Sequence, residues 1–215
     1  MFVLTADQNA STRHGDKVAA LLDQVGRWTA AHTDPSAVVR PLERTVGDEV
    51  QTVLGTADAA LDLALHLVRL GEWAVGIGAG AVDEPLAETS RASSGPAFVH
   101  ARGAVERARG RSVPAPVVVA GDDDEAAGQA TALVQLLASV LRRRSRAGWE
   151  VADRLVPGAR QKDVAAALGI SEQAVSQRVR SALLEEERAV RPLAAALIAR
   201  AEGEGAVRAG EKEAQ

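Results

Sequence analysis

The chain alternates between short apolar runs and longer segments in which apolar residues recur every three or four positions. The first pattern is typical of buried strands and the second of amphipathic helices. Strands are predicted at residues 2–6, 37–46, 49–54, 72–82 and 115–121. Helices are predicted at residues 15–32, 56–70, 93–109 and 122–144. The second and third strands form a hairpin, because Gly47-Asp48 between them is a turn signal.

This order, β-α-β-β-α-β-α-β-α, predicts an α+β fold. Its sheet is close to a ferredoxin-like, cyclase-like arrangement with helices packed on it. After Arg143 no strand pattern remains and the signals are all helical. We therefore expect an α+β domain over residues 1–145, a small all-α domain over residues 146–200, and a disordered tail over residues 201–215.

The all-α segment contains two short helical patterns around a glycine. Residues 161–168 form the first, Gly169 is the turn, and Ser171 is a suitable N-cap for a second helix that begins at Glu172. On a helical wheel, the apolar residues of the second helix share one side and its polar residues share the other. This pattern predicts a helix-turn-helix, which places its second helix in the DNA major groove.

The predicted DNA contacts are side chains of the types that read base edges and phosphates. They are Gln161, Lys162, Ser171, Glu172, Gln173, Ser176, Gln177 and Arg180. The string DVAAALGISEQAVSQRV resembles the helix-turn-helix of sigma-factor region 4 and related regulators. The alternative is an ordinary helical hairpin with a solvated face. The basic run Arg142–Arg146 is either a phosphate contact or a solvated helix end.

Charge is distributed unevenly along the chain. The formal net charge of the whole chain is −4. Residues 1–141 carry 11 Lys and Arg against 18 Asp and Glu, whereas residues 142–200 carry 12 against 7. This asymmetry indicates two modules with different partners, of which the basic one meets double-stranded DNA. Because a single module usually binds DNA weakly, we expect a homodimer on a two-fold site.

Composition narrows the cellular setting. Apolar residues make up 47% of the chain, enough for a folded core, and cysteine is absent. The lack of cysteine excludes disulfides and thiolate metal sites. The first residues show no signal-peptide pattern, and no apolar stretch approaches the roughly 20 residues of a membrane span. We therefore expect a cytoplasmic protein with no membrane partner.

Two aspartates lie at the ends of predicted strands. Asp7 follows the first strand and Asp48 lies in the hairpin turn, so their carboxylates converge if the strands are neighbours. Paired carboxylates suit Mg²⁺, which commonly brings substrate phosphates. The alternative is that both aspartates only shape turns. We leave Glu49 out of this site, because it is expected to point to the opposite face from Asp48.

A resemblance sharpens this expectation. The motifs LTADQNASTR, VGDEVQ, VGIGAG and GPAFVHAR occur in the order and spacing of the SatD family, over residues 1–145. The same segment looks like a distant relative of class III nucleotidyl cyclases and GGDEF-type cyclases. In those enzymes, an Asp at the end of the first strand and an Asp in the hairpin turn hold two metal ions on a nucleoside triphosphate.

By that resemblance Asp7 and Asp48 are the metal ligands. The implied nucleotide contacts are Gln8, Asn9, Ala10, Ser11, Gly47 and Arg102. One position departs from the cyclase pattern. Class III cyclases carry an Asn four residues before an Arg, and both stabilise the transition state, but the residue four positions before Arg102 is Phe98. A phenyl ring cannot donate a hydrogen bond to a developing charge.

The sequence therefore predicts a DNA-binding transcriptional regulator. Its cyclase-like domain binds a ligand, with a purine nucleotide and Mg²⁺ as the candidate, or mediates dimerisation. The alternative is a nucleotidyl cyclase or another phosphoryl-transfer enzyme with an accessory helix-turn-helix, which Phe98 opposes. In a third interpretation the domain is a ligand-free scaffold for protein contacts.

Overall fold

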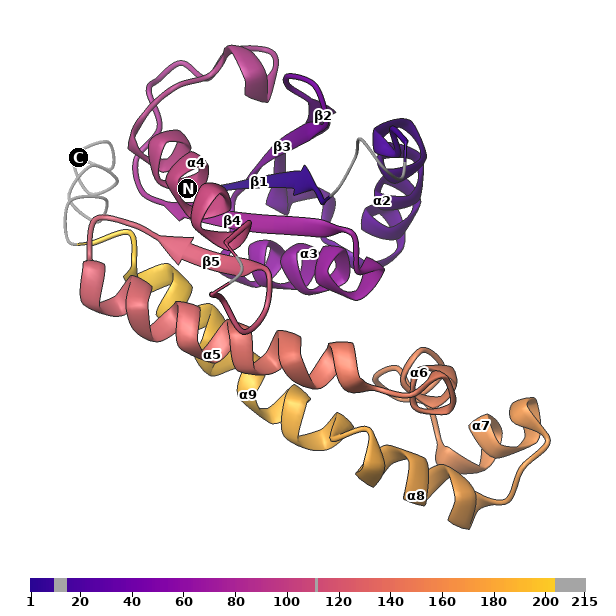
Figure 1. The fold of residues 1–215 in the computed structure, drawn as a ribbon. Coiled ribbons are helices and arrows are strands. Elements are labelled where there is room, and N and C mark those ends of the chain that lie inside the picture. The colour runs from indigo at the N-terminus through magenta and orange to yellow at the C-terminus, as the bar shows by residue number, and fades with distance from the viewer. Residues whose placement is uncertain (10–14, 111, 204–215) are drawn as a thin grey trace, which may run out of the picture.

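The structure is a computed structural model that describes residues 1–9, 15–110 and 112–203 (Figure 1). The strands are β1 (Phe2–Gln8), β2 (Val38–Arg44), β3 (Glu49–Leu54), β4 (Trp73–Ala79) and β5 (Val117–Ala120). The helices are α2 (Val18–His32), α3 (Ala57–Leu70), α4 (Pro96–Ala108), α5 (Asp124–Arg143), α6 (Arg146–Ala152), α7 (Gln161–Leu168), α8 (Glu172–Ser181) and α9 (Leu184–Arg200). Two short 3₁₀ turns are η1 (Pro35–Ala37) and η2 (Ser90–Ala92).

The strands form one mixed sheet in the order β2-β3-β1-β4-β5. β1 lies between β3 and β4 and is antiparallel to both, β2 is antiparallel to β3, and β5 is parallel to β4. The predicted α+β class is confirmed. Local signals also hold, because Thr56 caps α3 through its side chain and Gly71 ends it at a φ of 83°.

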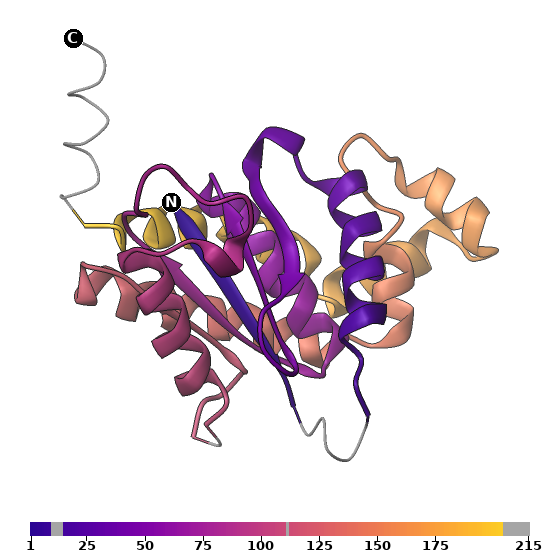
Figure 2. The same cartoon turned by 90° about the horizontal axis from the view of Figure 1, so that it is seen from above.

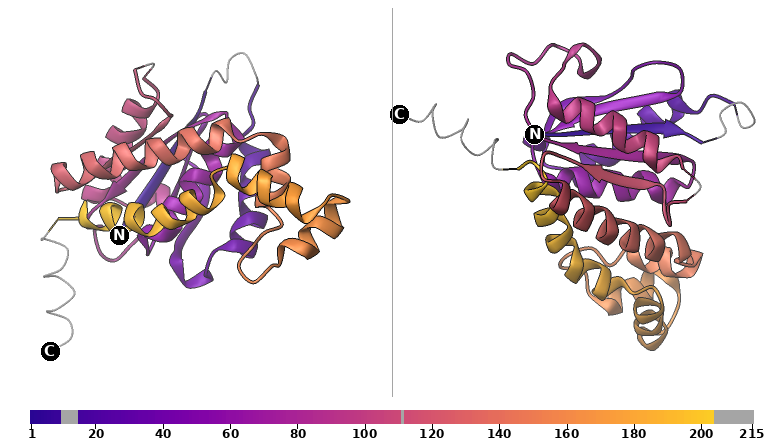
Figure 3. Two further views of the ribbon diagram at one scale, coloured as in Figure 1. Left: turned by 90° about the horizontal axis from the view of Figure 1, so that it is seen from below. Right: turned by 60° about the vertical axis from the view of Figure 1, so that its left-hand side comes forward.

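Helices cover the two faces of the sheet unequally (Figure 3). Alternate strand side chains, such as Leu4 and Ile77, enter the main core with α2, α3, α5 and α9. The other face is covered by α4, whose alanines pack on Val3 and Val53. Since successive strand residues point to opposite faces, Asp7 lies on the α4 side together with Val3.

Helix α4 rests directly on β4 because that strand has two glycines on this face. A Cβ atom at Gly78 would lie 2.1 Å from the carbonyl oxygen of Ala97, and one at Gly76 would lie 2.3 Å from the amide nitrogen of Val105. Any side chain here would collide with the helix backbone. The glycine-rich strand therefore permits close helix packing and positions α4 beside the end of β1.

The three helices α6, α7 and α8 form a separate small cluster at one end of the molecule (Figures 1 and 2). Its apolar centre contains Val151, Val164, Val175 and Val179. The turn between α7 and α8 is at Gly169, whose φ of 64° is left-handed, and Ser171 caps α8 by accepting a hydrogen bond from the amide of Ala174. The two predicted helices are therefore present.

Helix α9 corrects the expected division of the chain. We assigned all of residues 146–200 to the second module, but Ala194, Ala195 and Ile198 are buried in the core of the sheet domain. The helix runs from the end of α8 back to α5 and α3 (Figure 3). Its apolar stripe needs a partner, and α3 and α5 provide one.

Residues 201–203, which we assigned to the tail, are placed against the sheet domain. Ala201 is buried and its carbonyl oxygen accepts a hydrogen bond from the amide of Asp123, while Glu202 forms an ion pair with the amino group of Met1. Residues 204–215 lie outside the described part of the chain. No helix among the described residues combines the length and apolar character needed to cross a membrane.

A group of charged side chains around the buried Arg144 and Glu187, which we call the joint, links the small helical cluster to the sheet domain. Arg144 donates to the carbonyl oxygen of Ala182 and to Glu187, 3.0 Å away. Arg191 pairs with Glu187 and with Asp62 of α3. The buried Arg144 side chain is not available to DNA, which corrects the interpretation of Arg142–Arg146 as one exposed basic run.

The Trp149 ring stacks with two arginine side chains at this joint. The Trp149 ring lies 3.7 Å from the guanidinium carbon of Arg69 and 4.5 Å from that of Arg144. Arg69 also forms a two-pronged ion pair with Asp153, at 2.7 Å for each contact. Since Arg69 belongs to α3 and Trp149 to α6, these contacts hold the helical cluster against the sheet domain.

Candidate functional site

The end of β1 and the hairpin turn come together as the sequence suggested. The Gln8 amide donates to the Asp48 carbonyl oxygen at 3.3 Å. Asp7 is paired across the antiparallel ladder with Glu49, the first residue of β3. Directly paired residues share a face, so Glu49 lies on the same side as Asp7. Glu49 therefore lies beside Asp7, a placement that depends on where β3 begins and how it pairs with β1.

The Asp7 side chain is buried among other charges. It is 9% exposed, and its Oδ2 atom lies 3.1 Å from Nη1 of Arg109, just beyond the end of α4. Its Oδ1 atom is buried and has no hydrogen-bond partner among the described residues. Burial raises the pKa of Asp7 above its usual value, and the charges of Asp48 and Glu49 raise it further, whereas Arg109 opposes them. This environment favours an additional positive charge.

The carboxylates fit Mg²⁺ only in part. Asp7, Asp48 and Glu49 supply oxygen ligands of the kind that Mg²⁺ prefers, and the free Oδ1 atom of Asp7 is an acceptor. Within the described ranges, no three acidic or histidine side chains surround a common point closely enough to hold a metal ion. Mg²⁺ is commonly held by one or two carboxylates together with substrate phosphates. Asp7 and Asp48 would hold such an ion, and the metal would neutralise phosphate charge.

A cleft of about 620 Å³ opens on the same face of the sheet, between α4 and the β2–β3 hairpin. Its floor includes Gln51, which donates to Thr5 of β1 at 3.1 Å, two residues before Asp7. Further lining side chains include Arg91, Phe98, Arg102 and Glu106. A volume of this size is within the range of small-molecule sites.

The cleft contains some predicted nucleotide residues and omits others. Arg102 lines it, and Phe98 presents a ring where the cyclase pattern has an amide. Arg91 also lines it, although no sequence motif pointed to this residue. Gly47 lies beside the cleft, in the turn that follows Val46, with a φ of 61° that a glycine adopts readily. Two guanidinium groups and a ring suit an anionic, partly apolar ligand.

The turn after β1 contributes less than expected. The Gln8 side chain is buried, because its Nε2 donates to the Gly15 carbonyl oxygen at 2.7 Å and its Oε1 accepts from the Lys17 amide at 2.9 Å. The Asn9 amide donates to the Glu72 carbonyl oxygen. The Gln8 side chain therefore closes the loop and is not free to bind phosphate, which corrects its predicted role. The predicted contacts Ala10 and Ser11 lie outside the described residues.

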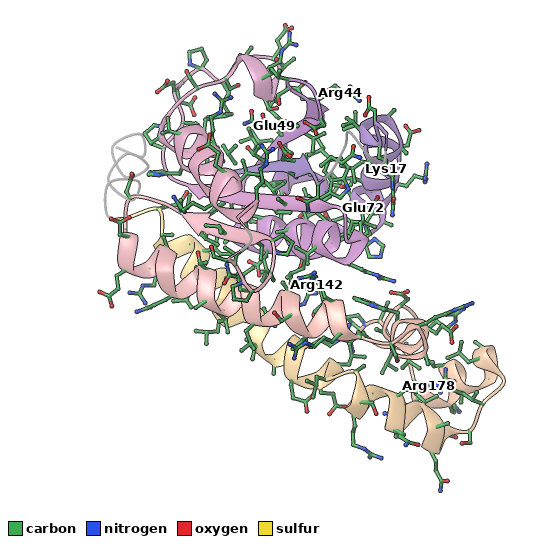
Figure 4. All side chains as sticks on the ribbon, viewed as in Figure 1. Lys17, Arg44, Glu49, Glu72, Arg142 and Arg178 are labelled. Carbon is green, nitrogen blue, oxygen red and sulfur yellow. The ribbon has the colours of Figure 1, made fainter. Side chains whose placement is uncertain are left out.

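The predicted DNA face is largely exposed on α8. Glu172, Gln173, Gln177 and Arg180 are exposed, and Val175 and Val179 are buried beneath them. Lys162 on α7 is exposed as well. This face lies far from the carboxylates: Figure 4 shows Arg178 at the α8 end and Glu49 in the sheet domain.

Three of the predicted DNA contacts, Gln161, Ser171 and Ser176, have hydrogen-bond partners within the protein. Ser176 donates to Gln161 at 2.6 Å, so these two side chains hold α7 and α8 together. The Ser171 hydroxyl accepts the capping hydrogen bond of α8. Arg178, on the flank of the helix, pairs with Glu150 at 3.4 Å. The predicted contacts whose exposed side chains have no hydrogen-bond or ion-pair partner among the described residues are Lys162, Glu172, Gln173, Gln177 and Arg180.

No family model, curated protein or solved structure matches the chain. The resemblance to SatD proteins and to cyclases therefore stays a prediction. The roles of the residues above must be argued from their positions alone.

His66 of α3 is a partly buried titratable side chain that packs against α2. Its ring is stacked on Trp28, with centroids 4.4 Å apart, and its Nε2 atom is buried without a hydrogen-bond partner among the described residues. Burial, together with the charges of Arg69 and His32, lowers the pKa of His66 to about 4, while Asp153 opposes the shift. The folded protein therefore holds His66 neutral below its usual pKa of 6.5.

We expect this group to destabilise the protein in acid. As the pH falls from about 6.5 to about 4, His66 becomes protonated in the unfolded chain but not in the folded one, so the free energy of unfolding decreases. His66→Phe keeps an aromatic ring beside Trp28 and removes the titration. The melting temperature of this variant should fall less steeply with pH over that interval. Equal slopes for the two proteins would contradict the prediction.

Proposed function

We propose that this protein is a DNA-binding transcriptional regulator whose sheet domain binds an anionic ligand, with a purine nucleotide and Mg²⁺ as the first candidate. The observation that carries the proposal is the α8 surface, where Gln173, Gln177 and Arg180 are exposed above a buried apolar side. Arg bonds well to guanine and Gln to adenine in the major groove. The cluster of α6 to α8 projects from the sheet domain, so a duplex has access to it (Figure 1).

The arrangement of the small cluster supports a helix-turn-helix over an ordinary hairpin. α7 and α8 are joined by a three-residue turn containing Gly169, and Ser171 begins the second helix. The second helix exposes polar residues of the base-reading kind, whereas an ordinary solvated helix commonly carries charged pairs at a spacing of four residues. The basic balance of residues 142–200 also supports DNA as the partner.

The sheet domain supports the ligand part of the proposal. Each neighbouring pair among β2, β3, β1 and β4 is antiparallel, as a ferredoxin-like, cyclase-like sheet would require, and β5 is added parallel to β4 at the edge. The acceptor atom of Asp7 and the cleft with Arg91 and Arg102 lie on one face. Phosphates bound to those arginines and to Mg²⁺ at Asp7 and Asp48 would complete the site.

Replacement of the reading side chains is expected to weaken specific binding. Gln177→Ala and Arg180→Ala should each cost about 1–3 kcal/mol in binding free energy, because each removes a base contact and leaves the fold intact. A duplex would first be selected from a random pool by the wild-type protein. Affinity would then be measured by fluorescence anisotropy at fixed salt.

The matched control is Arg27→Ala, at an exposed arginine of α2 in the other module. It should leave the affinity unchanged. If Gln177→Ala and Arg180→Ala also leave it unchanged, α8 does not read DNA through this face.

The ligand part is tested by thermal stability with ATP, GTP and cyclic nucleotides, with and without Mg²⁺. A ligand at 100 times its Kd should stabilise the folded protein by about 2.7 kcal/mol, and only when Mg²⁺ is present. Asp7→Asn should abolish this effect. The same variant should raise the melting temperature without ligand, because the charged form of Asp7 is unfavourable in its buried site.

Asp23→Asn, at an exposed position of α2, is the control for these measurements. It should bind as the wild type does and melt at the same temperature. A lower melting temperature for ligand-free Asp7→Asn would instead mean that the Asp7–Arg109 ion pair is a net stabilising contact. The absence of any nucleotide effect would favour the scaffold interpretation.

A second candidate function is phosphoryl transfer, favoured by two features: a buried Asp7 oxygen that has no hydrogen-bond partner among the described residues, and Arg102 in the cleft. It would require turnover of ATP or GTP with Mg²⁺ or Mn²⁺ that is lost in Asp48→Ala. Phe98 opposes it, since the ring cannot stabilise charge in a transition state.

A further inference from the structure

The outer surface of α5 carries a stripe of side chains, all exposed except the half-buried Ser139, that the proposed function does not use. Its members recur at helical spacing and lie on the side away from the core: Glu125, Gln129, Ala132, Leu136, Ser139 and Arg143. Leu136, at the centre of the stripe, is 60% exposed. No other helix is drawn in front of α5 in Figure 1.

The stripe is complementary to itself when reversed. Glu125 and Arg143 lie nine residues on either side of position 134, and Ala132 and Leu136 lie two residues on either side. An antiparallel second copy of α5, related by a two-fold axis at this point, places each residue on its counterpart. A carboxylate then meets a guanidinium at both ends, and a leucine meets an alanine at the centre.

Side-chain size follows the same symmetry. Gly128 and Val140 lie six residues on either side of position 134, on opposite edges of the stripe. Gly128 is exposed, and a Cβ atom placed on it would have no neighbour within 4 Å. Large residues opposite small ones allow two helices to pack closely along their length. Leu136 and Val140 also line a hollow of about 160 Å³ with Leu183, which is 43% exposed.

The charged ends of the stripe are free to pair with another molecule. Within the described residues, neither Glu125 nor Arg143 belongs to an ion pair. Glu125 accepts a hydrogen bond from Gln129 on its own helix, 3.0 Å away, which leaves the carboxylate exposed.

The neighbouring sheet edge is a poorer contact for a second copy. The Thr131 hydroxyl accepts from the Val119 amide at 2.9 Å and donates to its carbonyl oxygen at 3.1 Å. Gln135 donates to the Val117 carbonyl oxygen at 3.0 Å. These side chains satisfy the outward backbone groups of β5, so a strand from another molecule has little to bind there.

We infer that two copies of this chain associate through antiparallel packing of α5 on α5, with Glu125 of each copy paired to Arg143 of the other. Both ends of α5 contribute equally, so the dimer is closed. The inference does not depend on DNA or nucleotide binding, because the residues it uses lie in neither proposed site.

The test is a charge-exchange series in the full-length chain. The molar mass would be measured by light scattering after gel filtration, and the dimer Kd by analytical ultracentrifugation. Glu125→Arg and Arg143→Glu each place like charges at both ends of the contact. Each should raise the dimer Kd about tenfold or more. The double variant restores opposite charges and should return the Kd toward that of the wild type.

Two controls separate this contact from general effects of charge and folding. Arg27→Glu makes the same change of charge as Arg143→Glu, but on α2, and should leave the dimer Kd unchanged. Circular dichroism melting should show that all variants remain folded, since the altered side chains are exposed. A monomeric wild-type protein, a dimer insensitive to both single changes, or a double variant without recovery would each overturn the inference.

Discussion

Glu187→Ala is expected to destabilise the protein by about 3–5 kcal/mol. The side chains of Arg144 and Glu187 are 2% and 3% exposed, so their charges are almost fully removed from water. Removal of the carboxylate leaves the buried Arg144 charge with a backbone carbonyl and the Trp149 ring but no carboxylate, and Arg191 loses its contact on the same helix. The free energy of unfolding, measured by urea titration, should therefore fall by a large part of the total.

Two variants control this measurement. Glu186→Ala alters an exposed neighbour on the same helix and should change stability by less than about 0.5 kcal/mol. Glu187→Gln retains hydrogen-bonding atoms, so its loss of unfolding free energy should lie between those of Glu187→Ala and Glu186→Ala. If Glu187→Ala and Glu186→Ala have the same effect, the buried pair does not hold α9 to the rest of the protein.

Gly78→Ala is expected to cost about 3 kcal/mol or more, although it adds a single methyl group. That group would lie 2.1 Å from the carbonyl oxygen of Ala97 and 2.3 Å from the amide nitrogen of Ala101. Both are backbone atoms of α4, so the whole helix must move away from β4. Since α4 forms one wall of the cleft, ligand binding should weaken together with the melting temperature.

Gly26→Ala is the matched control, because it makes the same chemical change in α2. A Cβ atom at Gly26 has no neighbour within 4 Å. It should therefore stabilise the protein by about 0.5–1 kcal/mol through helix propensity. Similar effects of the two substitutions would show that α4 does not lie as close to β4 as described.

Most helices and strands could be predicted because their signals are local. The capping side chains of Thr56 and Ser171 and the left-handed glycines Gly71 and Gly169 act within a few residues of themselves. The sequence assigned α9 only to an all-helical segment, and such a signal does not say which surface the helix covers. Its return to α3 and α5 depends on a groove formed by distant segments, so the domain boundary was misplaced.

The candidate site likewise combines residues that local signals predicted with residues that depend on tertiary contacts. Asp7 and Asp48 could be placed at strand ends from turn signals alone, and Arg102 from a motif. Glu49 was missed because the face it shares with Asp7 depends on the pairing of β1 with β3. Arg109 was missed because its contact with Asp7 spans the chain from β1 to the end of α4.

Hydrophobic period, caps and turn residues were enough to establish the α+β class, the hairpin and the polar side of α8, because each depends on neighbours along the chain. The tertiary structure decided which carboxylates share a face, which arginine is buried and where α9 packs. Those outcomes depend on strand register and on contacts between segments far apart in sequence. The free energy of such contacts comes from burial and charge pairing, which no local pattern contains.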